Sequence, residues 1–143
     1  MPVDIGSKAE GPSQPKLRTF PVNPNIFKRK TNHFTPTWYT RHTWIIYSIL
    51  KDKVYCFPCI FFGVDMRENT FTEKGFNNWA HAIGDIKKGL DKHGNSETHI
   101  TAVSKWEIYK NNPVTIEERL NPHRSDLVEK KRDYFIKIIN YIR

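Results

Sequence analysis

Two cysteines and two histidines of this chain have residue types and a spacing suited to binding zinc. Cys56 and Cys59 form a C-x2-C pair, and His93 and His99 follow after a gap of 33 residues. Zinc in structural sites takes four such sulfur and nitrogen ligands in a tetrahedron, at about 2.3 Å from sulfur and about 2.0–2.1 Å from nitrogen. The pattern therefore predicts one structural Zn2+ ion, bound by Cys56, Cys59, His93 and His99.

Other interpretations of the cysteine pair fit the sequence less well. A redox C-x-x-C motif opens a helix after a strand, whereas Cys59 is followed by Ile-Phe-Phe-Gly, which is typical of a strand. A zinc deaminase needs a His-x-Glu pair and a Pro-Cys-x-x-Cys box, but Pro58 lies between the cysteines. The H-E-x-x-H motif of metalloproteases is absent. One further alternative is that the cysteines are buried thiols and the histidines ordinary surface residues.

Composition and charge narrow the class of protein. The chain has 143 residues, enough for one domain with tails, and its net charge of +8 favours a polyanionic partner. No run approaches the ~20 apolar residues of a membrane span, and the amino terminus lacks the apolar segment of a secretory signal. We therefore expect an intracellular, reducing location, where a cysteine pair suggests metal binding before a disulfide.

The composition of the chain predicts an amino-terminal arm followed by the strands that position the two cysteines. Residues 1–33 are rich in Pro, Gly, Ser and Lys and predict a disordered basic arm. Residues 44–50 are aromatic and β-branched and predict a strand. The segments on either side of Phe57-Pro58 also resemble strands, so we expect a small antiparallel sheet with the cysteines on a tight turn.

Helical patterns follow the predicted sheet. Apolar residues spaced by three and four predict one helix over residues 75–93. A second helix is expected from Ser96, its candidate N-cap, to Lys110, with Ile100, Val103 and Trp106 on its apolar side. The fold class is therefore α+β: a small zinc-organised domain over residues 34–110, with helices packed on a short antiparallel sheet. The four tryptophans are predicted to lie in its core and not on a base-stacking surface: Trp38, Trp44, Trp79 and Trp106.

The predicted domain is small enough to need its metal. A core of roughly 77 residues is marginal by itself. Structural zinc contributes about 10–16 kcal/mol in finger peptides, which matches or exceeds the stability of about 5–15 kcal/mol of a typical domain. We therefore expect the fold to depend on zinc. Residues 111–143 are predicted to be a charged linker and the start of a helix that the sequence ends within.

At these residues the chain resembles the TTF-type zinc finger of hAT-superfamily transposases and of transposase-derived, MYM-type-related proteins. The resemblance covers roughly residues 4–110. It is carried by Asp4-Ile5-Gly6, Gln14-Pro15, Phe20-Pro21, Trp38-Tyr39, Trp44, Tyr47-Ser48, the Tyr-Cys-Phe-Pro-Cys-Ile-Phe-Phe box, Gly75-Phe76-Asn77-Asn78-Trp79, Lys88-Gly89 and His-Gly-Asn-Ser-Glu-Thr-His.

The resemblance implies a nuclear, DNA-binding role. In such proteins the finger is regarded as the element that recognises transposon ends, and a ribonuclease-H-like catalytic domain follows it. Because this sequence ends at Arg143, the acidic residues of that domain are expected to be missing, and Glu117, Glu118 and Asp126 are not expected to replace them. We expect no catalytic residue and no enzymatic activity, since a closed Cys2His2 site leaves no position for a reacting water.

Basic and amide side chains beside the predicted zinc site are candidates for contact with double-stranded DNA. Lysine and arginine would contact phosphates, and asparagine would contact base edges. The predicted DNA-binding residues are Lys28, Arg29, Lys30, Lys74, Asn77, Asn78, Lys87, Lys88, Lys92 and Lys105, with His81 and Lys110 as further candidates. The alternative is a zinc-stabilised module that binds a protein partner in a nuclear chromatin or transcription complex. Basic residues gathered on one face would favour DNA, and an exposed apolar patch would favour a protein.

Overall fold

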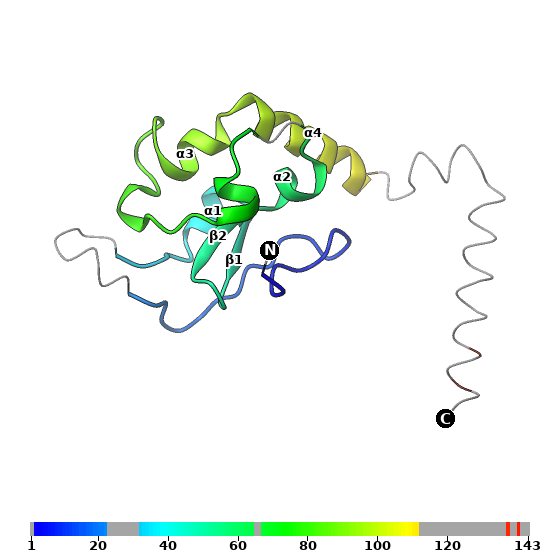
Figure 1. Ribbon diagram of the computed structural model, residues 1–143, viewed down its shortest axis with the longest axis horizontal. Helices are drawn as coiled ribbons and strands as arrows, with labels where there is room; N and C mark the ends of the chain where they lie inside the picture. The colour runs from blue at the N-terminus through cyan, green and yellow to red at the C-terminus, as the bar shows by residue number, and fades with distance from the viewer. Residues whose placement is uncertain (1, 23–31, 65–66, 112–136, 138–139, 141–143) are drawn as a thin grey trace. The chain divides into compact units, whose positions relative to one another are not determined.

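The computed structural model describes residues 2–22, 32–64 and 67–111 and the isolated positions 137 and 140. The chain divides into two compact units, Met1–Trp106 and Glu107–Arg143. No helix among the described residues is long and apolar enough to cross a membrane. The elements follow in the order α1 (Trp38–Arg41), β1 (Ile45–Ser48), β2 (Lys53–Cys56), α2 (Phe57–Phe62), the π-helical turn η1 (Thr70–Lys74), the 3-10 turn η2 (Trp79–His81), α3 (Gly89–Gly94) and α4 (Glu97–Asn111) (Figure 1).

An antiparallel hairpin is the centre of this α+β fold and confirms the strand expected within residues 44–50. Ile45 pairs with Cys56, and Ser48 pairs with Lys53. Asp52 closes the turn at φ 50°, a left-handed conformation that Asp tolerates better than most residues. Every residue of β1 is buried. A strand covered on both faces has consecutive apolar residues instead of alternating ones, as Ile45, Ile46 and Tyr47 do here.

The amino-terminal residues cover the free edge of β1. The backbone N–H of Tyr47 donates to the carbonyl of Ser13 at 3.1 Å, and Ile5 and Phe20 are buried. For residues 2–22 the expectation of a disordered arm therefore does not hold. Their backbone pairs with a strand edge that would otherwise be open, and their apolar side chains enter the core. The predicted basic run of the arm lies outside the described residues: Lys28, Arg29 and Lys30.

The other edge of the hairpin is covered by Phe76, so the single helix expected over residues 75–93 is wrong. Phe76 exchanges two backbone hydrogen bonds of 2.8 Å with Val54 of β2. The 3-10 turn η2 follows, and α3 starts only at Gly89. Gly84 and Gly89 have φ angles of 90° and 58°, which interrupt a right-handed helix. The apolar residues that are buried here belong to separate short elements, with Trp79 in η2 and Leu90 in α3.

Aromatic rings fill the core around Phe34. Its ring lies 4.7 Å from that of Tyr47, 5.3 Å from that of Trp38 and 5.8 Å from that of Trp79, measured between centroids. Edge and tilted contacts of this kind add to the free energy of burial itself. The prediction that all four tryptophans belong to the core is confirmed, since they are buried: Trp38, Trp44, Trp79 and Trp106.

The buried face of α4 differs from the predicted one. His99, Ala102 and Trp106 face inward, whereas Ile100 is 54% exposed. Successive helix residues are turned by about 100°, so a helix that directs His99 inward must turn Ile100 outward. Ile100 is therefore exposed despite its apolar side chain, because it directly follows His99, which faces inward.

Asp4 fixes the amino-terminal segment to the hairpin turn. Its carboxylate accepts hydrogen bonds from the Ser48 hydroxyl at 2.7 Å and from the backbone N–H of Leu50 at 3.1 Å. Burial alone would raise the pKa of Asp4, but these hydrogen bonds outweigh it and lower that pKa.

We predict that Asp4→Asn lowers the free energy of unfolding by about 1–2 kcal/mol, because the hydrogen bonds to a charged acceptor are removed. Urea denaturation at neutral pH and fixed zinc concentration measures this. Hydrogen exchange at the Leu50 amide should become faster. Glu10→Gln is the matched control, because the Glu10 carboxylate accepts a hydrogen bond from the nearby, exposed Ser7 hydroxyl and, among the described residues, does not join the amino-terminal segment to the hairpin. Equal midpoints for the two variants would contradict the anchoring role.

Candidate metal centre

The two cysteines lie at a junction between a strand and a helix. Cys56 is the last residue of β2, and Cys59 is in the first turn of α2. The strand expected from Cys59 onward is therefore wrong, as is the tight turn between two strands. Pro58 suits the first helical turn, because that turn leaves backbone N–H groups without partners and proline has none. The helical turn brings the thiols of Cys56 and Cys59 to the same side.

The two histidines come from consecutive helices with a short break between them. His93 is the penultimate residue of α3, and His99 is in the first turn of α4. Ser96 lies in the break, where its hydroxyl donates to the carbonyl of His93 at 2.7 Å and accepts from the N–H of His99 at 3.4 Å. This is the capping position predicted for Ser96. The same side chain therefore ties together the backbones of both histidines.

The four side chains converge on one point. Their ligand atoms all lie within 4.8 Å of one another, and all four residues are buried. Cys56 Sγ lies 3.3 Å from His99 Nδ1, Cys59 Sγ lies 3.4 Å from His93 Nε2, and Cys59 Sγ lies 3.7 Å from His99 Nδ1. A tetrahedral zinc ion separates a sulfur ligand from a nitrogen ligand by about 3.6 Å. The donor set and its spacing thus fit zinc, and this Cys2His2 cluster could hold a single ion.

The surroundings of the cysteines favour a thiolate in the cluster. A hydrogen bond from the Cys56 thiol, together with those from His93 and His99, lowers the pKa of the Cys59 thiol to about 3 although burial opposes this. Burial raises the pKa of the Cys56 thiol well above its usual range. Zinc binds thiolates, so a metal ion would displace the remaining thiol proton. Cys56 and Cys59 do not form a disulfide. The imidazoles of His93 and His99, which contact the two thiols, distinguish this pair from a redox C-x-x-C motif.

Aromatic side chains enclose the cluster. The Trp44 ring lies 4.7 Å from the His99 ring and 5.2 Å from the His93 ring. Phe71 stacks on His93 at 4.2 Å with an interplanar angle of 28°. Such contacts fix the orientation of the imidazoles and exclude water from the ligands.

Asp91 is a buried positioning residue that the sequence did not reveal. Its carboxylate accepts hydrogen bonds from His42 Nε2 at 3.1 Å and from the backbone N–H of Gly84 at 2.7 Å, and Arg41 lies 3.2 Å away. These contacts hold α3, which carries His93, against the end of α1 and against the loop before α3. Burial lowers the pKa of His42, although Asp91 opposes this. The sequence did not indicate this role for Asp91, because its partner His42 is 49 positions away in the chain.

A basic cleft of about 490 Å3 lies beside His93. It brings together four of the predicted DNA-binding residues: Asn78, Lys87, Lys88 and Lys92. The three lysines are exposed, and Glu68 is the acidic residue that also lines the cleft. His81 lines it as well and is not one of the clustered Cys and His side chains.

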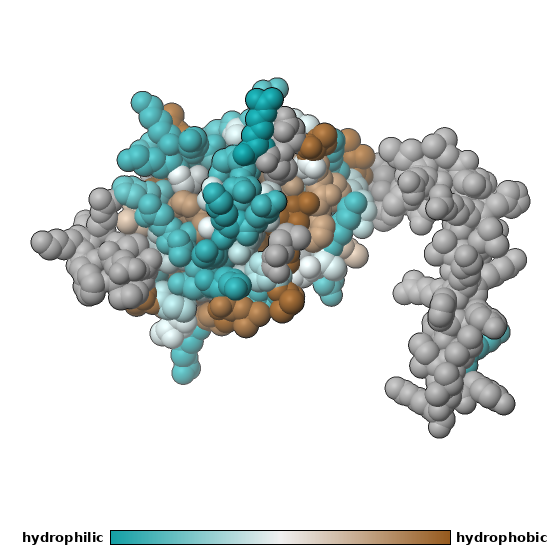
Figure 2. All heavy atoms as spheres, in the orientation of Figure 1, coloured by the Kyte–Doolittle hydropathy of each residue, from teal (hydrophilic) through white to brown (hydrophobic). Residues whose placement is uncertain are grey.

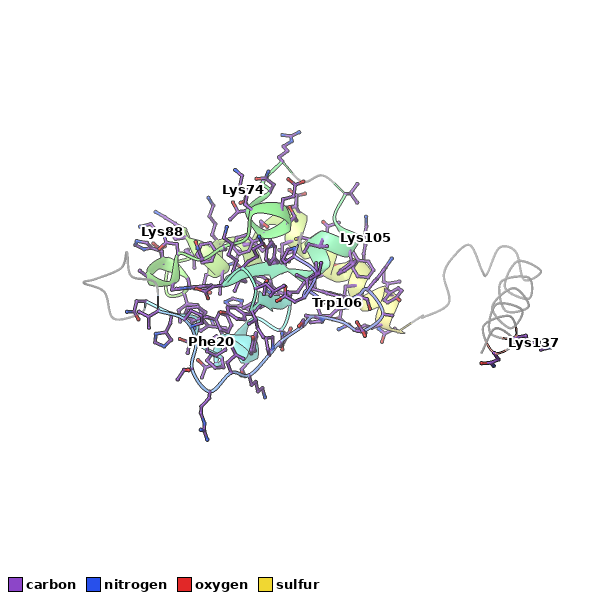
Figure 3. The ribbon with its side chains drawn as sticks, turned by 60° about the horizontal axis from the view of Figure 1, so that its bottom comes forward. Phe20, Lys74, Lys88, Lys105, Trp106 and Lys137 are labelled. Atoms are coloured by element: carbon purple, nitrogen blue, oxygen red, sulfur yellow. The ribbon has the colours of Figure 1, made fainter. Side chains whose placement is uncertain are left out.

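The other candidates that lie within the described residues are not at this cleft. Lys74 and Asn77 are exposed but do not line the cleft. Figure 3 shows Lys88 and Lys105 on opposite sides of the molecule, with Lys74 at a third position. The labelled lysines of the predicted DNA-binding set thus lie at separate places on the described part of the chain.

Comparison with known proteins finds similarity to zinc finger proteins. The chain is 30% identical over 119 residues to zinc finger MYM-type protein 5 of Macaca fascicularis, covering 73% of this chain and 17% of that protein. It is 30% identical over 105 residues to the proteins of that name from Homo sapiens and Mus musculus, covering 67% of this chain and 14% and 16% of theirs. The chain thus spans less than a fifth of the length of these curated relatives. No family model and no solved structure matches it.

The names of these relatives describe zinc fingers and no enzyme. Together with the clustered Cys2His2 side chains, the similarity supports a zinc-binding module.

We predict that the purified chain contains one zinc ion and unfolds when a chelator removes it, because the ligands join β2, α2, α3 and α4. Metal analysis and circular dichroism measure the two effects. Cys59→Ser and His99→Ala should each abolish folding at neutral pH, whereas His33→Ala should retain zinc. Lowering the pH should release the metal, since protons compete for the same sulfur and nitrogen atoms. A folded, zinc-free chain would contradict this prediction.

Gly89 provides a test of how α3 is positioned. At its φ of 58°, an added Cβ would lie 2.1 Å from the carbonyl oxygen of His81 and 2.6 Å from that of Ala82. We predict that Gly89→Ala destabilises the fold by about 2 kcal/mol or more. Gly94→Ala in the same helix is the control, because its Cβ would meet nothing closer than 3.7 Å. Thermal unfolding of both zinc-loaded variants should separate them, and similar midpoints would contradict the predicted role of Gly89.

Proposed function

We propose that this chain is a zinc-dependent DNA-binding module, related to the TTF-type finger of hAT transposase-like proteins, that acts in the nucleus without enzymatic activity. The observation that carries the proposal is the basic cleft beside the candidate zinc ligand His93. Lys87, Lys88 and Lys92 face a common space there, and Asn78 lies at the same cleft. Lysines supply phosphate contacts and asparagine suits the edge of adenine.

The rigidity of the candidate zinc site supports this role. Lys92 precedes His93 directly, and Lys87 and Lys88 precede the first residue of α3. A metal bound by His93 would therefore hold all three lysines at fixed positions relative to the hairpin. Preorganised cationic side chains lose less conformational entropy when they bind. The net charge of +8 adds attraction at longer range.

A non-enzymatic role fits a closed ligand set. Four protein ligands complete a tetrahedral zinc site and leave no open position for a reacting water. We propose that residues 34–110, together with residues 2–22 that pack against them, form the finger domain. Residues 111–143 are proposed to begin the region that follows the finger in transposase-like proteins.

A protein-interaction module is the second candidate function. Ile49 and Leu50 at the hairpin turn are 49% and 66% exposed, and Val3, which precedes Asp4 in the chain, is 91% exposed. Figure 2 shows hydrophobic side chains, in brown, at the lower edge of the molecule, where Figure 1 places the hairpin turn. Exposed apolar side chains that lie together favour a protein partner.

We predict that the zinc-loaded chain binds duplex DNA with an affinity that falls as salt increases. Replacing Lys87, Lys88 and Lys92 with Gln should weaken binding, because fewer phosphates are neutralised. The slope of log K against log salt should become shallower by about 0.9 for each phosphate that the variant no longer neutralises. Fluorescence anisotropy at several salt concentrations measures this.

The charge-matched control replaces Lys16, Arg18 and Lys51 with Gln, because none of these residues lines the cleft. Equal weakening by both triple variants would remove the cleft from the DNA interface. A folded, zinc-loaded chain without DNA binding at low salt would leave the protein-interaction function as the better candidate.

A further inference from the structure

The cleft beside His93 has an aromatic side as well as a basic one. Phe71 and Phe76 both line it, and their rings stack at 5.3 Å with an interplanar angle of 17°. Phe76 is half-buried, whereas Phe71 is buried and also stacks on His93. Contact with phosphates along a duplex would need the lysines but not this aromatic wall.

The position of Phe76 is fixed by the backbone. Its two 2.8 Å hydrogen bonds with Val54 attach it to the edge of β2, and Gly75 before it has φ 80°. Thus Phe76 is held on the rigid hairpin and not on a loose loop. A rigid aromatic face is suited to stacking, because binding costs it little side-chain entropy.

Polar groups around the aromatic wall match the rest of a nucleotide. The amide of exposed Asn78 can both donate to and accept from the edge of a base, and Lys88 and Lys92 can contact its phosphate. Among the described residues, the cleft is lined by one negatively charged side chain, that of Glu68, and by three positively charged lysines, so its net charge favours a phosphate. The volume of about 490 Å3 falls within the range of about 300–1,000 Å3 for sites that hold a small ligand.

We propose that this cleft accepts a single unpaired nucleotide of DNA, with its base against Phe76, its base edge at Asn78 and its phosphate at the lysines. The proposal rests on the DNA-binding function and adds a substrate feature to it. Bases inside a duplex have both faces covered by their neighbours, whereas an unpaired base that leaves the stack can offer a face to an aromatic side chain. DNA with an extrahelical or terminal unpaired nucleotide is therefore the preferred ligand.

The test compares three duplexes of the same sequence: fully paired, with one unpaired nucleotide, and with an abasic residue at that position. The full-length, zinc-loaded chain should bind the second duplex about tenfold more tightly than the other two. Asn78→Ala and Phe76→Leu should each lower the affinity for the duplex with the unpaired nucleotide to that for the abasic duplex. Asn111→Ala is the matched control, because Asn111 is exposed and does not line the cleft. Zinc content and thermal midpoints establish that each variant is folded.

The outcomes separate this proposal from the DNA-binding function. Equal affinity for the unpaired and abasic duplexes would overturn the nucleotide site and leave DNA binding intact. If no duplex binds, the DNA-binding function fails, and titration of the isotope-labelled chain with a deoxynucleoside monophosphate then tests the cleft alone. Resonance shifts confined to Phe76, Asn78 and Lys88 would support the site, and their absence would overturn it.

Discussion

Four ligand atoms from β2, α2, α3 and α4 must stay within 4.8 Å of one another to hold one ion, and much of the structure can be traced to that requirement. The hairpin fixes Cys56, and the helix that begins directly after it turns Cys59 to the same side. The break at Ser96 lets α3 and α4 present histidines to a common point. The small core of a protein with a two-stranded sheet holds distant segments together only weakly. A metal ion bound where the four ligands meet would link these segments and stabilise the fold.

Neighbouring segments on both edges stabilise the two-stranded hairpin that carries Cys56. A two-stranded hairpin is marginal by itself and has two open edges. Here the amino-terminal segment covers one edge through Ser13, and Phe76 covers the other. Phe76 then lies beside the cleft whose basic side is formed around α3. The covered edge and the candidate binding cleft are therefore parts of one arrangement, in which the hairpin positions the aromatic wall and α3 positions the lysines.

Much of the candidate site could be anticipated because its chemistry is recorded in residue types. Cysteine and histidine are the ligands that zinc prefers, and only two cysteines are present, so the four residues could be named before their contacts were known. Asp91 could not be found in this way. Its role depends on His42, which is 49 positions away in the chain, and a buried aspartate has no local pattern that distinguishes it from an exposed one.

Residue types and local periodicity were enough to predict the ligand types, the buried strand at residues 45–48, the aromatic core and the break between the last two helices. Tertiary packing was needed to establish that residues 57–62 form a helix, that Phe76 joins a strand edge, that residues 2–22 pack on the hairpin and that Ile100 faces solvent. The physical reason is that an apolar side chain is compatible with several elements. Which one it joins depends on which edges need partners and on which direction each histidine must face.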